Sequence, residues 1–149
     1  SIDDETHRLA VDFIKQEEGV RKEAYWDHGR WSIGYGTKSH AGETIKEEEA
    51  DVRLLNYLTE HVYPIVRDIH PEYGPPQKAA IASLAYNIGR GQFLSSRCYQ
   101  RLKEGRIDQA TSEWLEFRLI TTESGEKKIS PGLYQRRTRE VRLFLKGLK

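Results

Sequence analysis

One segment of the chain is apolar or small on every side of the helix that it predicts. Between Gln77 and Ile88, the apolar residues are Ala79, Ala80, Ile81, Ala82, Leu84, Ala85 and Ile88. A helix that is hydrophobic all round is normally buried at the centre of a domain. Pro75-Pro76 suits a helix start and Gly89 suits a helix end. We therefore predict a buried central helix over about 77–88.

An amphipathic pattern predicts a helix near the beginning of the chain. Leu9, Phe13 and Ile14 lie on one face of this helix, which should end near Gly19. The residues available as caps near its start are Asp3, Asp4 and Thr6. Further along, Thr44-Ile45-Lys46-Glu47 matches a capping box, which opens a second helix. The apolar positions of that helix are Ala50, Leu54, Leu58 and Val62.

Beyond the central helix, the pattern predicts shorter helices at about 94–103 and 108–117, with Gly105 between them. A polar loop should follow over 121–132, and a last helix over about 134–146. The last helix carries Val141, Phe144, Leu145 and Leu148 on one side and arginines on the other. Basic amphipathic helices sometimes bind membranes, but this stripe is also typical of any packed terminal helix. We favour packing against the core.

Between residues 25 and 37 the pattern changes from helical to extended. Aromatic residues, a β-branched residue and glycines occur there, and Asp27-His28-Gly29 has the chemistry of a tight turn. We predict a small hairpin. Gly34 and Gly36 flank Tyr35, where glycine permits positive φ or lets a ligand approach the backbone closely.

The composition limits the classes of protein to consider. A chain of 149 residues suits one domain with its own core, and its single cysteine, Cys98, can form no intramolecular disulfide. We interpret Cys98 as a small residue packed in a helix, because no histidine constellation accompanies it. No stretch approaches the roughly 20 apolar residues that span a bilayer, and the acidic start at 1–5 is unlike a signal peptide.

Charge is unevenly distributed along the chain. Residues 1–60 carry 8 Lys and Arg against 14 Asp and Glu, and residues 61–149 carry 16 against 9, which gives net charges of −6 and +7. A basic half attracts an anionic envelope polymer or a nucleic acid. No zinc-finger spacing, phosphate-binding glycine loop or RNA-binding aromatic signature is present, so we expect no nucleic-acid partner. A solvated charged surface is the alternative reading.

Three motifs occur in order along the chain. Residues 18–37 read E-G-x-x-x-x-x-Y-x-D, then a glycine turn, a small hydroxyl residue and I-G-Y-G; residues 83–89 read S-L-A-Y-N-I-G; and residues 131–140 contain G-L-x-x-R-R-x-x-E. Together they resemble the phage-type lysozymes, the glycoside hydrolase family of the T4 and P22 enzymes. The resemblance implies an α+β, lysozyme-like fold. We expect one domain over 1–149, with a small β-containing lobe at about 19–60, a helical lobe from 1–18 and 61–149, and the active-site cleft between them.

The resemblance also implies an activity, hydrolysis of the bond between N-acetylmuramic acid and N-acetylglucosamine in peptidoglycan. Such cleavage takes two carboxylates, one protonated as general acid and one ionised opposite it. In the family the glutamate that matches Glu18 is the general acid, and an arginine of the closing segment pairs with it. Arg136 and Arg137 are the two alternatives for that arginine. Composition alone would make Glu18 a solvated helix-end residue.

Asp27 is the second carboxylate that the resemblance implies, although it is also an ordinary turn residue. In an inverting enzyme, Asp27 would help to orient and activate the attacking water, and Ser32 would hydrogen-bond the same water. Ser32 departs from the family's usual threonine, and the turn between Asp27 and Ser32 is one residue shorter than in many members. These departures bear on the stereochemical outcome and not on the bond that is cut.

Further residues match positions where the family contacts its substrate: Tyr35, Gly36, Lys38, Tyr86 and Asn87. An amide can hydrogen-bond an N-acetyl group, and an aromatic ring can lie on a sugar face. The structural alternative for Tyr86 and Asn87 is helix-end packing and capping, and Thr37 stands where many members have histidine. The five histidines show no metal-ligand spacing, so we expect neither a metal nor a cofactor.

The sequence leaves two alternative functions open. A lytic transglycosylase cuts the same bond with a single acid, and Asp27 argues against it; an inactive glycan-binding domain of a phage particle would not need Glu18, Asp27 and Ser32. We expect a monomer whose partner is the peptidoglycan glycan strand. It would act in the bacterial periplasm, either as a free endolysin made in the host cytoplasm or as a domain of a virion-associated protein.

Overall fold

A buried helix, α4, lies at the centre of the molecule. The computed structural model describes residues 2–148; Ser1 and Lys149, which the expected domain includes, lie outside the described residues. α4 spans Pro75–Ile88, with prolines in its first turn and Gly89 (φ 95°) after its last. Residues 79–85 are all buried. The predicted central helix is confirmed, and it begins two residues earlier than expected.

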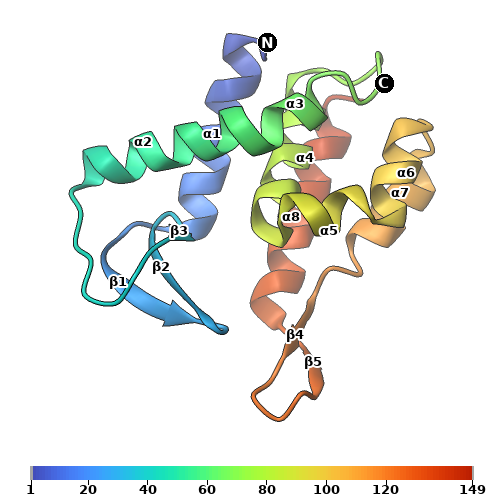
Figure 1. Ribbon diagram of the computed structural model, residues 1–149. Helices are drawn as coiled ribbons and strands as arrows, with labels where there is room; N and C mark the ends of the chain where they lie inside the picture. The colour runs from blue at the N-terminus through green and yellow to red at the C-terminus, as the bar shows by residue number, and fades with distance from the viewer. Residues whose placement is uncertain (1, 149) are drawn as a thin grey trace.

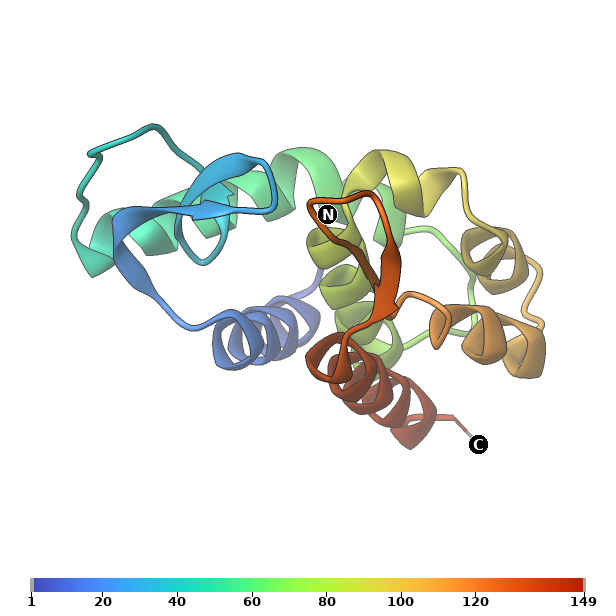
Figure 2. The same cartoon turned by 90° about the horizontal axis from the view of Figure 1, so that it is seen from below.

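Helices from the two ends of the chain pack against α4, as Figures 1 and 2 show. α1 spans Asp4–Glu18, and the Asp3 carboxylate caps it by accepting a hydrogen bond from the Thr6 backbone N–H at 2.8 Å. α8 spans Pro131–Lys146, and Ser130 caps it through the backbone N–H of Leu133. The first and last helices of the sequence therefore both lie against the central helix α4.

The predicted separation of apolar residues and arginines on α8 is wrong in part. Val141 and Phe144 are buried as expected, but Leu145 is 46% exposed. Arg136 and Arg137 lie inside the molecule instead of in solvent. The apolar periodicity of the helix did not indicate their burial, because arginine is mostly exposed in proteins unless it is paired. Here Glu140 of the same helix pairs with both, and the family resemblance had implied that one of them pairs with Glu18.

One nearly continuous helical segment follows the sheet. α2 (Glu47–Tyr57), the π-helix η1 (Leu58–Val62) and α3 (Tyr63–Val66) run from the sheet toward α4 (Figure 1). The apolar row that was predicted for this helix is buried, and its members are Ala50, Leu54, Leu58 and Val62.

The predicted capping box of α2 is wrong. The N-cap is Lys46, which makes no side-chain cap. Thr44 instead forms a bridge with Glu23, and the flanking backbone bonds Ala24 N–H to Glu43 C=O and Ile45 N–H to Lys22 C=O hold this segment beside β1. The backbone before α2 is therefore hydrogen-bonded to β1.

The predicted hairpin is part of a three-stranded antiparallel sheet. β1 (Arg21–Asp27) pairs with β2 (Arg30–Gly34), which pairs with β3 (Thr37–Lys38). The turn is the pair His28-Gly29, and both residues have positive φ, 47° and 90°. A two-residue turn of this kind matches the twist of the flanking strands. The register places Tyr25 opposite Ser32, Trp26 opposite Trp31, and Asp27 opposite Arg30.

The segment after α4 differs from the prediction in two places. The expected helix at 94–103 is α6 (Arg97–Lys103), which begins later than expected because Ser96 caps it through the backbone N–H of Tyr99. A short helix that was not expected, α5 (Arg90–Leu94), precedes it. α7 spans Ile107–Trp114. The expected polar loop at 121–132 instead contains a hairpin, β4 (Leu119–Thr121) with β5 (Lys127–Ile129), which projects from the helices (Figures 1 and 2).

Cys98 lies in the core of the helical part. It is 1% exposed, and its thiol donates to the carbonyl of Ala110 at 3.5 Å. Burial raises the pKa of the thiol to about 12, which keeps it protonated. This confirms the structural interpretation of Cys98. In the part of the chain that the structure describes, no helix combines the length and the apolar character that crossing a membrane requires.

Candidate active site

Glu18 is held where α1 ends. Gly19 (φ 65°) follows it and turns the chain out of the helix. The Glu18 side chain is 17% exposed, and its Oε2 accepts a hydrogen bond from Arg136 Nη1. Its Oε1 lies against Gly36 (φ 93°), where an added Cβ would stand 3.2 Å from this oxygen. Glycine at position 36 thus leaves room for the carboxylate, and Arg136, not Arg137, is the arginine that contacts it.

Arg136 and Arg137 belong to a buried network centred on Glu140. Glu140 is fully buried and accepts hydrogen bonds from Ser83 Oγ at 2.6 Å and from Trp114 Nε1 at 3.0 Å. Arg136 Nε donates to Glu140 Oε2 at 3.1 Å, and Arg137 Nε lies 2.9 Å from Glu140 Oε1. Four groups from three helices thus surround one carboxylate.

The surroundings of the two arginines affect their pKa values differently. Burial lowers the pKa of Arg136, but the charges of Glu18 and Glu140 outweigh burial and raise it. Burial also lowers the pKa of Arg137. The charge of Glu140 raises this pKa by less than burial lowers it, so the net shift is downward. Both side chains remain cationic at neutral pH, since a guanidinium does not lose its proton in proteins.

Asp27 lies at the tip of the sheet, on the last residue of β1. Its side chain is 46% exposed, and its Oδ1 is 3.4 Å from His28 Nε2. Arg30, opposite Asp27 in the register, donates from Nη2 to the carbonyl of Gly36 at 2.7 Å. This bond connects the tip of the hairpin to the turn that supports Glu18.

Tyr25 and Ser32 occupy the same face of the sheet as Asp27, because paired residues and every second residue share a face. Ser32 is buried, and its Oγ has no hydrogen-bond partner among residues 2–148. Burial raises the pKa of Tyr25, and the negative charges of Asp27 and Glu18 raise it further. Tyr25 therefore lies within electrostatic range of both carboxylates.

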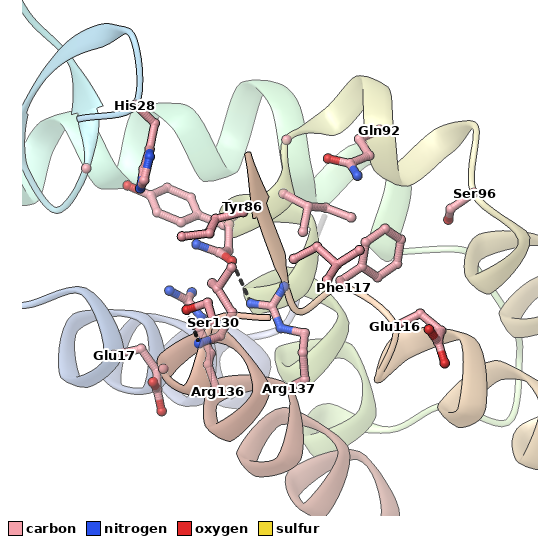
Figure 3. Close-up of a pocket in the computed structure, with 18 of the residues that line it drawn as sticks. Glu17, His28, Tyr86, Gln92, Ser96, Glu116, Phe117, Ser130, Arg136 and Arg137 are labelled. Atoms are coloured by element: carbon pink, nitrogen blue, oxygen red, sulfur yellow. Dashed lines mark hydrogen bonds between the residues drawn. The ribbon is translucent and has the colours of Figure 1, made fainter. Parts of the chain in front are cut away.

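A cleft of about 1360 Å³ runs between the sheet and the helices. The sheet side contributes Asp27, His28, Arg30, Gly36 and Lys38, and the helical side contributes Tyr86, Asn87, Arg136 and Arg137. Figure 3 shows Tyr86, Arg136 and Arg137 around the pocket, with His28 on the sheet side and Phe117 on the helical side. Glu18 and Ser32 do not line the cleft. Glu18 lies directly behind two residues that do line it, Gly36 and Arg136.

Four of the five expected substrate-contact residues line this cleft: Gly36 between β2 and β3, Lys38 on β3, and Tyr86 and Asn87 near the end of α4. The Tyr86 hydroxyl donates to the carbonyl of Tyr35 at 2.6 Å, and burial raises the pKa of this hydroxyl. Asn87 Oδ1 accepts from Arg137 Nη2 at 2.6 Å, which leaves the amide N–H₂ of Asn87 for other partners. Gly89, not Asn87, follows α4 as its cap.

The Tyr35 side chain points away from the cleft. The ring is 5% exposed, and its hydroxyl donates to Asp51 Oδ1 at 3.3 Å. The ammonium group of Lys15 lies 5.4 Å from the ring centroid. The backbone carbonyl of Tyr35, through its bond with Tyr86, is the part of this residue that supports the cleft wall.

Sequence reasoning missed several parts of the site. Glu140 was visible only as the last letter of a motif, and its partners Ser83 and Trp114 lie 57 and 26 residues away. The β4–β5 hairpin also lines the cleft, through Leu119, Ile120 and Lys127. Among residues 2–148, no group of three or more His, Cys, Asp or Glu side chains has an arrangement that could hold a metal ion.

Comparison with known proteins gives a consistent result. The family described as Phage lysozyme matches residues 15–140. An endolysin of Bacillus phage B103 is 33% identical over 146 residues, which are 94% of this chain but 54% of that relative, so the chain spans about half of its length. An endolysin of Acyrthosiphon pisum secondary endosymbiont phage 1 is 31% identical over 134 residues, 88% of this chain and 91% of the relative. The solved muramidase domain of SpmX from Asticaccaulis excentricus superposes with a TM-score of 0.78 at 32% identity, covering 93% of this chain and 95% of that one.

Proposed function

Because the chain belongs to the phage lysozyme family, we propose that it is a peptidoglycan hydrolase, a muramidase that cuts the bond between N-acetylmuramic acid and N-acetylglucosamine. The observation that carries the proposal is Glu18, which is largely withdrawn from water and held by Arg136 behind a cleft that Asp27 lines from the sheet side. Two carboxylates with such different surroundings suit the two roles that glycoside cleavage requires.

In the proposed reaction, Glu18 gives its proton to the glycosidic oxygen as the bond to the anomeric carbon breaks. Asp27, which is half exposed, acts as the ionised carboxylate. It takes a proton from a water molecule while the water oxygen forms the new bond to the anomeric carbon. The buried hydroxyl of Ser32, which has no hydrogen-bond partner among residues 2–148, helps to orient that water. One water is consumed for each bond cut, and the anomeric configuration inverts.

The proposal assigns substrate positioning to the cleft walls. The free amide N–H₂ of Asn87 suits the carbonyl of an N-acetyl group, and the exposed ammonium of Lys38 suits an anionic group of the cell wall polymer. We propose that the protein acts on the bacterial cell wall, either as a free endolysin or as a domain of a virion-associated protein.

Mass spectrometry of purified peptidoglycan after digestion tests the reaction. Hydrolysis leaves reducing ends that contain one added water, whereas a lytic transglycosylase leaves anhydro ends of lower mass. We expect only reducing ends. Anhydro ends would replace the hydrolase with a transglycosylase, and an unchanged polymer would indicate a silent glycan-binding domain.

Proton NMR of the first products tests the stereochemistry. The bond that is cut is a β-linkage, so direct attack by water releases the α-anomer before mutarotation. A β-anomer as first product would exclude the inverting mechanism and require Asp27 to act as a nucleophile.

A further inference from the structure

Glu140 is a fully buried carboxylate that the proposed reaction does not use. It lies on α8 and has hydrogen-bond donors from α4, α7 and α8 itself. A buried charge is costly unless it is paired and its remaining lone pairs are filled, and here both conditions hold. Such a complete set of partners fixes the orientation of the Glu140 carboxylate, and through it the orientation of the arginines that it binds.

Arg136 joins Glu140 to Glu18. Its Nε donates to Glu140, its Nη1 donates to Glu18, and its Nη2 is 3.2 Å from Ser83 Oγ. The Arg136 side chain is 6% exposed, so water does not screen these contacts effectively. The planar guanidinium therefore has a carboxylate on each of two edges.

A cation beside Glu18 creates an electrostatic conflict with the proposed role of Glu18. An adjacent positive charge favours the ionised form of a carboxyl group, whereas a general acid must hold a proton at the working pH. The negative charge of Glu140 opposes this effect, because it offsets the field of Arg136 and repels charge on Glu18.

We propose that Glu140 is a positioning residue for the catalytic acid, which holds Arg136 in place and offsets its charge so that Arg136 supports Glu18 without keeping it ionised. This inference rests on the proposed function of Glu18. Each charged residue of the closing R-R-x-x-E motif then has its own role. Arg136 contacts Glu18, Glu140 partly offsets the charge of Arg136, and Arg137 neutralises the remaining charge of Glu140.

Charged and titratable groups on β1, α4, α6 and α8 interact with Glu18 or Glu140. Those that interact electrostatically with Glu18 are Tyr25 from β1, Tyr86 from α4, and Arg136 and Arg137 from α8. Those that interact with Glu140 are Cys98 from α6 and Arg136, Arg137 and Arg139 from α8. The tyrosines and the thiol are neutral near pH 7, so the formal charges of this set are the arginines and the two glutamates.

Charge substitutions with opposite expected signs test the proposal. Glu140→Gln leaves Arg136 and Arg137 facing Glu18 alone, which should favour ionised Glu18. Arg137→Gln leaves Arg136 between two carboxylates, which should favour protonated Glu18. The double variant loses one charge of each sign and should resemble the wild type.

The measurement is kcat/KM against pH on solubilised, purified peptidoglycan glycan strands, because this profile reports the ionisation of the free enzyme. We expect the alkaline limb of Glu140→Gln to move to lower pH by about 1 pH unit or more, the shift typical of an uncompensated charge nearby. The limb of Arg137→Gln should move to higher pH, and that of the double variant should return toward the wild type. A purely structural role for Glu140 would reduce activity without moving the limb.

A matched control is Glu17→Gln, which removes one carboxylate from the same α1–α8 interface. Glu17 pairs with Arg139 at 2.5 and 2.8 Å and does not contact Arg136. Glu17 lines the cleft and its charge acts on Arg137, so the alkaline limb of Glu17→Gln should move much less than that of Glu140→Gln. Circular dichroism establishes which variants fold; if Glu140→Gln does not, Arg137→Gln tests the same charge balance from the opposite side.

The outcomes separate this inference from the proposed function. A wild-type protein that releases no reducing ends overturns the proposed function itself. An active wild type whose alkaline limb is unchanged in the folded single variants overturns only the role of Glu140. A limb that moves equally in Glu17→Gln also overturns that role, since it would show that any lost carboxylate at this interface has the same effect.

Discussion

Glu18 is positioned by contacts on both of its oxygens. Arg136 donates to Oε2, and Gly36 leaves the space that Oε1 needs. The sequence predicted the helix end and the glycine, because both have local signals: a glycine at the end of an amphipathic pattern and a glycine-rich strand end. It could not distinguish Arg136 from Arg137, since adjacent residues on a helix point in directions about 100° apart and only the packing decides which one faces α1.

At the residue scale, the first prediction concerns the proton of Glu18. Glu18→Gln keeps the shape of the side chain and a hydrogen-bond acceptor for Arg136, but it has no transferable proton. Loss of a general acid should lower the rate by at least about 10²–10⁴-fold. Lysis of chloroform-treated Gram-negative cells measures the loss, and the thermal midpoint checks the fold. Glu17→Gln, the same change one residue earlier, should lose far less; retained lysis by Glu18→Gln would disprove the assignment.

The second residue-scale prediction ranks the groups that handle water. Asp27→Asn should be nearly inactive, because the amide cannot accept the proton of the attacking water. Ser32→Ala should be weaker than wild type but active, because Asp27 still orients the water when the hydroxyl is gone. Initial rates of reducing-end release on purified peptidoglycan give the order. Substantial activity in Asp27→Asn, with anhydro ends in its products, would favour the transglycosylase.

At the scale of elements, what could be predicted depended on whether the signal was local. The central helix α4, the row Ala50, Leu54, Leu58 and Val62, and the His28-Gly29 hairpin follow from periodicity and turn chemistry, and the structure confirms them. The capping box at Thr44 was wrong because backbone pairing with β1 overrides a local side-chain cap. The β4–β5 hairpin was missed because its strands have three residues each and few apolar side chains.

An ion pair that connects the sheet-side loop to α2 gives an element-scale prediction. Ser39 Oγ donates to Glu43 at 2.6 Å, and Arg53 Nη1 on α2 donates to it at 3.2 Å. The Arg53 and Ser39 hydrogen bonds lower the pKa of Glu43 from 4.5 to about 2. Since the folded pKa lies below the unfolded one, the stabilisation is present above pH 4.5 and is lost as the pH falls from about 4.5 to about 2.

Thermal unfolding of Glu43→Gln across this range checks the linkage. The variant should melt below the wild type at pH 6–7, and the two melting temperatures should converge as the pH falls toward 2. Glu49→Gln is the matched control, because Glu49 is 3.9 Å from the same arginine and more exposed. A gap between wild type and Glu43→Gln that stays constant with pH would mean that the ionised pair does not stabilise the fold.

At the scale of the whole molecule, the fold joins segments that lie far apart in the sequence. α1 and α8 both pack on α4, so the candidate acid from the first helix meets its arginine 118 residues later. We propose that the chain forms one domain for this reason, with the helical part containing residues from both ends of the chain. Folding also neutralises part of the negative charge of residues 1–60 and of the positive charge of residues 61–149. Arg136 and Arg137 are neutralised internally by Glu18 and Glu140, and Arg139 is paired with Glu17.

The last prediction concerns the basic charge that remains at the surface. The cleft is bordered by Arg30, Lys38, Arg97 and Lys127, all of them exposed. These cations should steer the protein toward an anionic cell wall, and salt should weaken the attraction as the Debye length falls from about 10 Å at 0.1 M to about 3 Å at 1 M. Raising salt should therefore slow lysis of whole envelopes more than cleavage of a short, uncharged chitooligosaccharide, because the surface cations do not steer an uncharged substrate. Rates of both reactions across this salt range provide the measurement. Equal salt sensitivity of the two substrates would show that the surface cations have no targeting role and are only solvated.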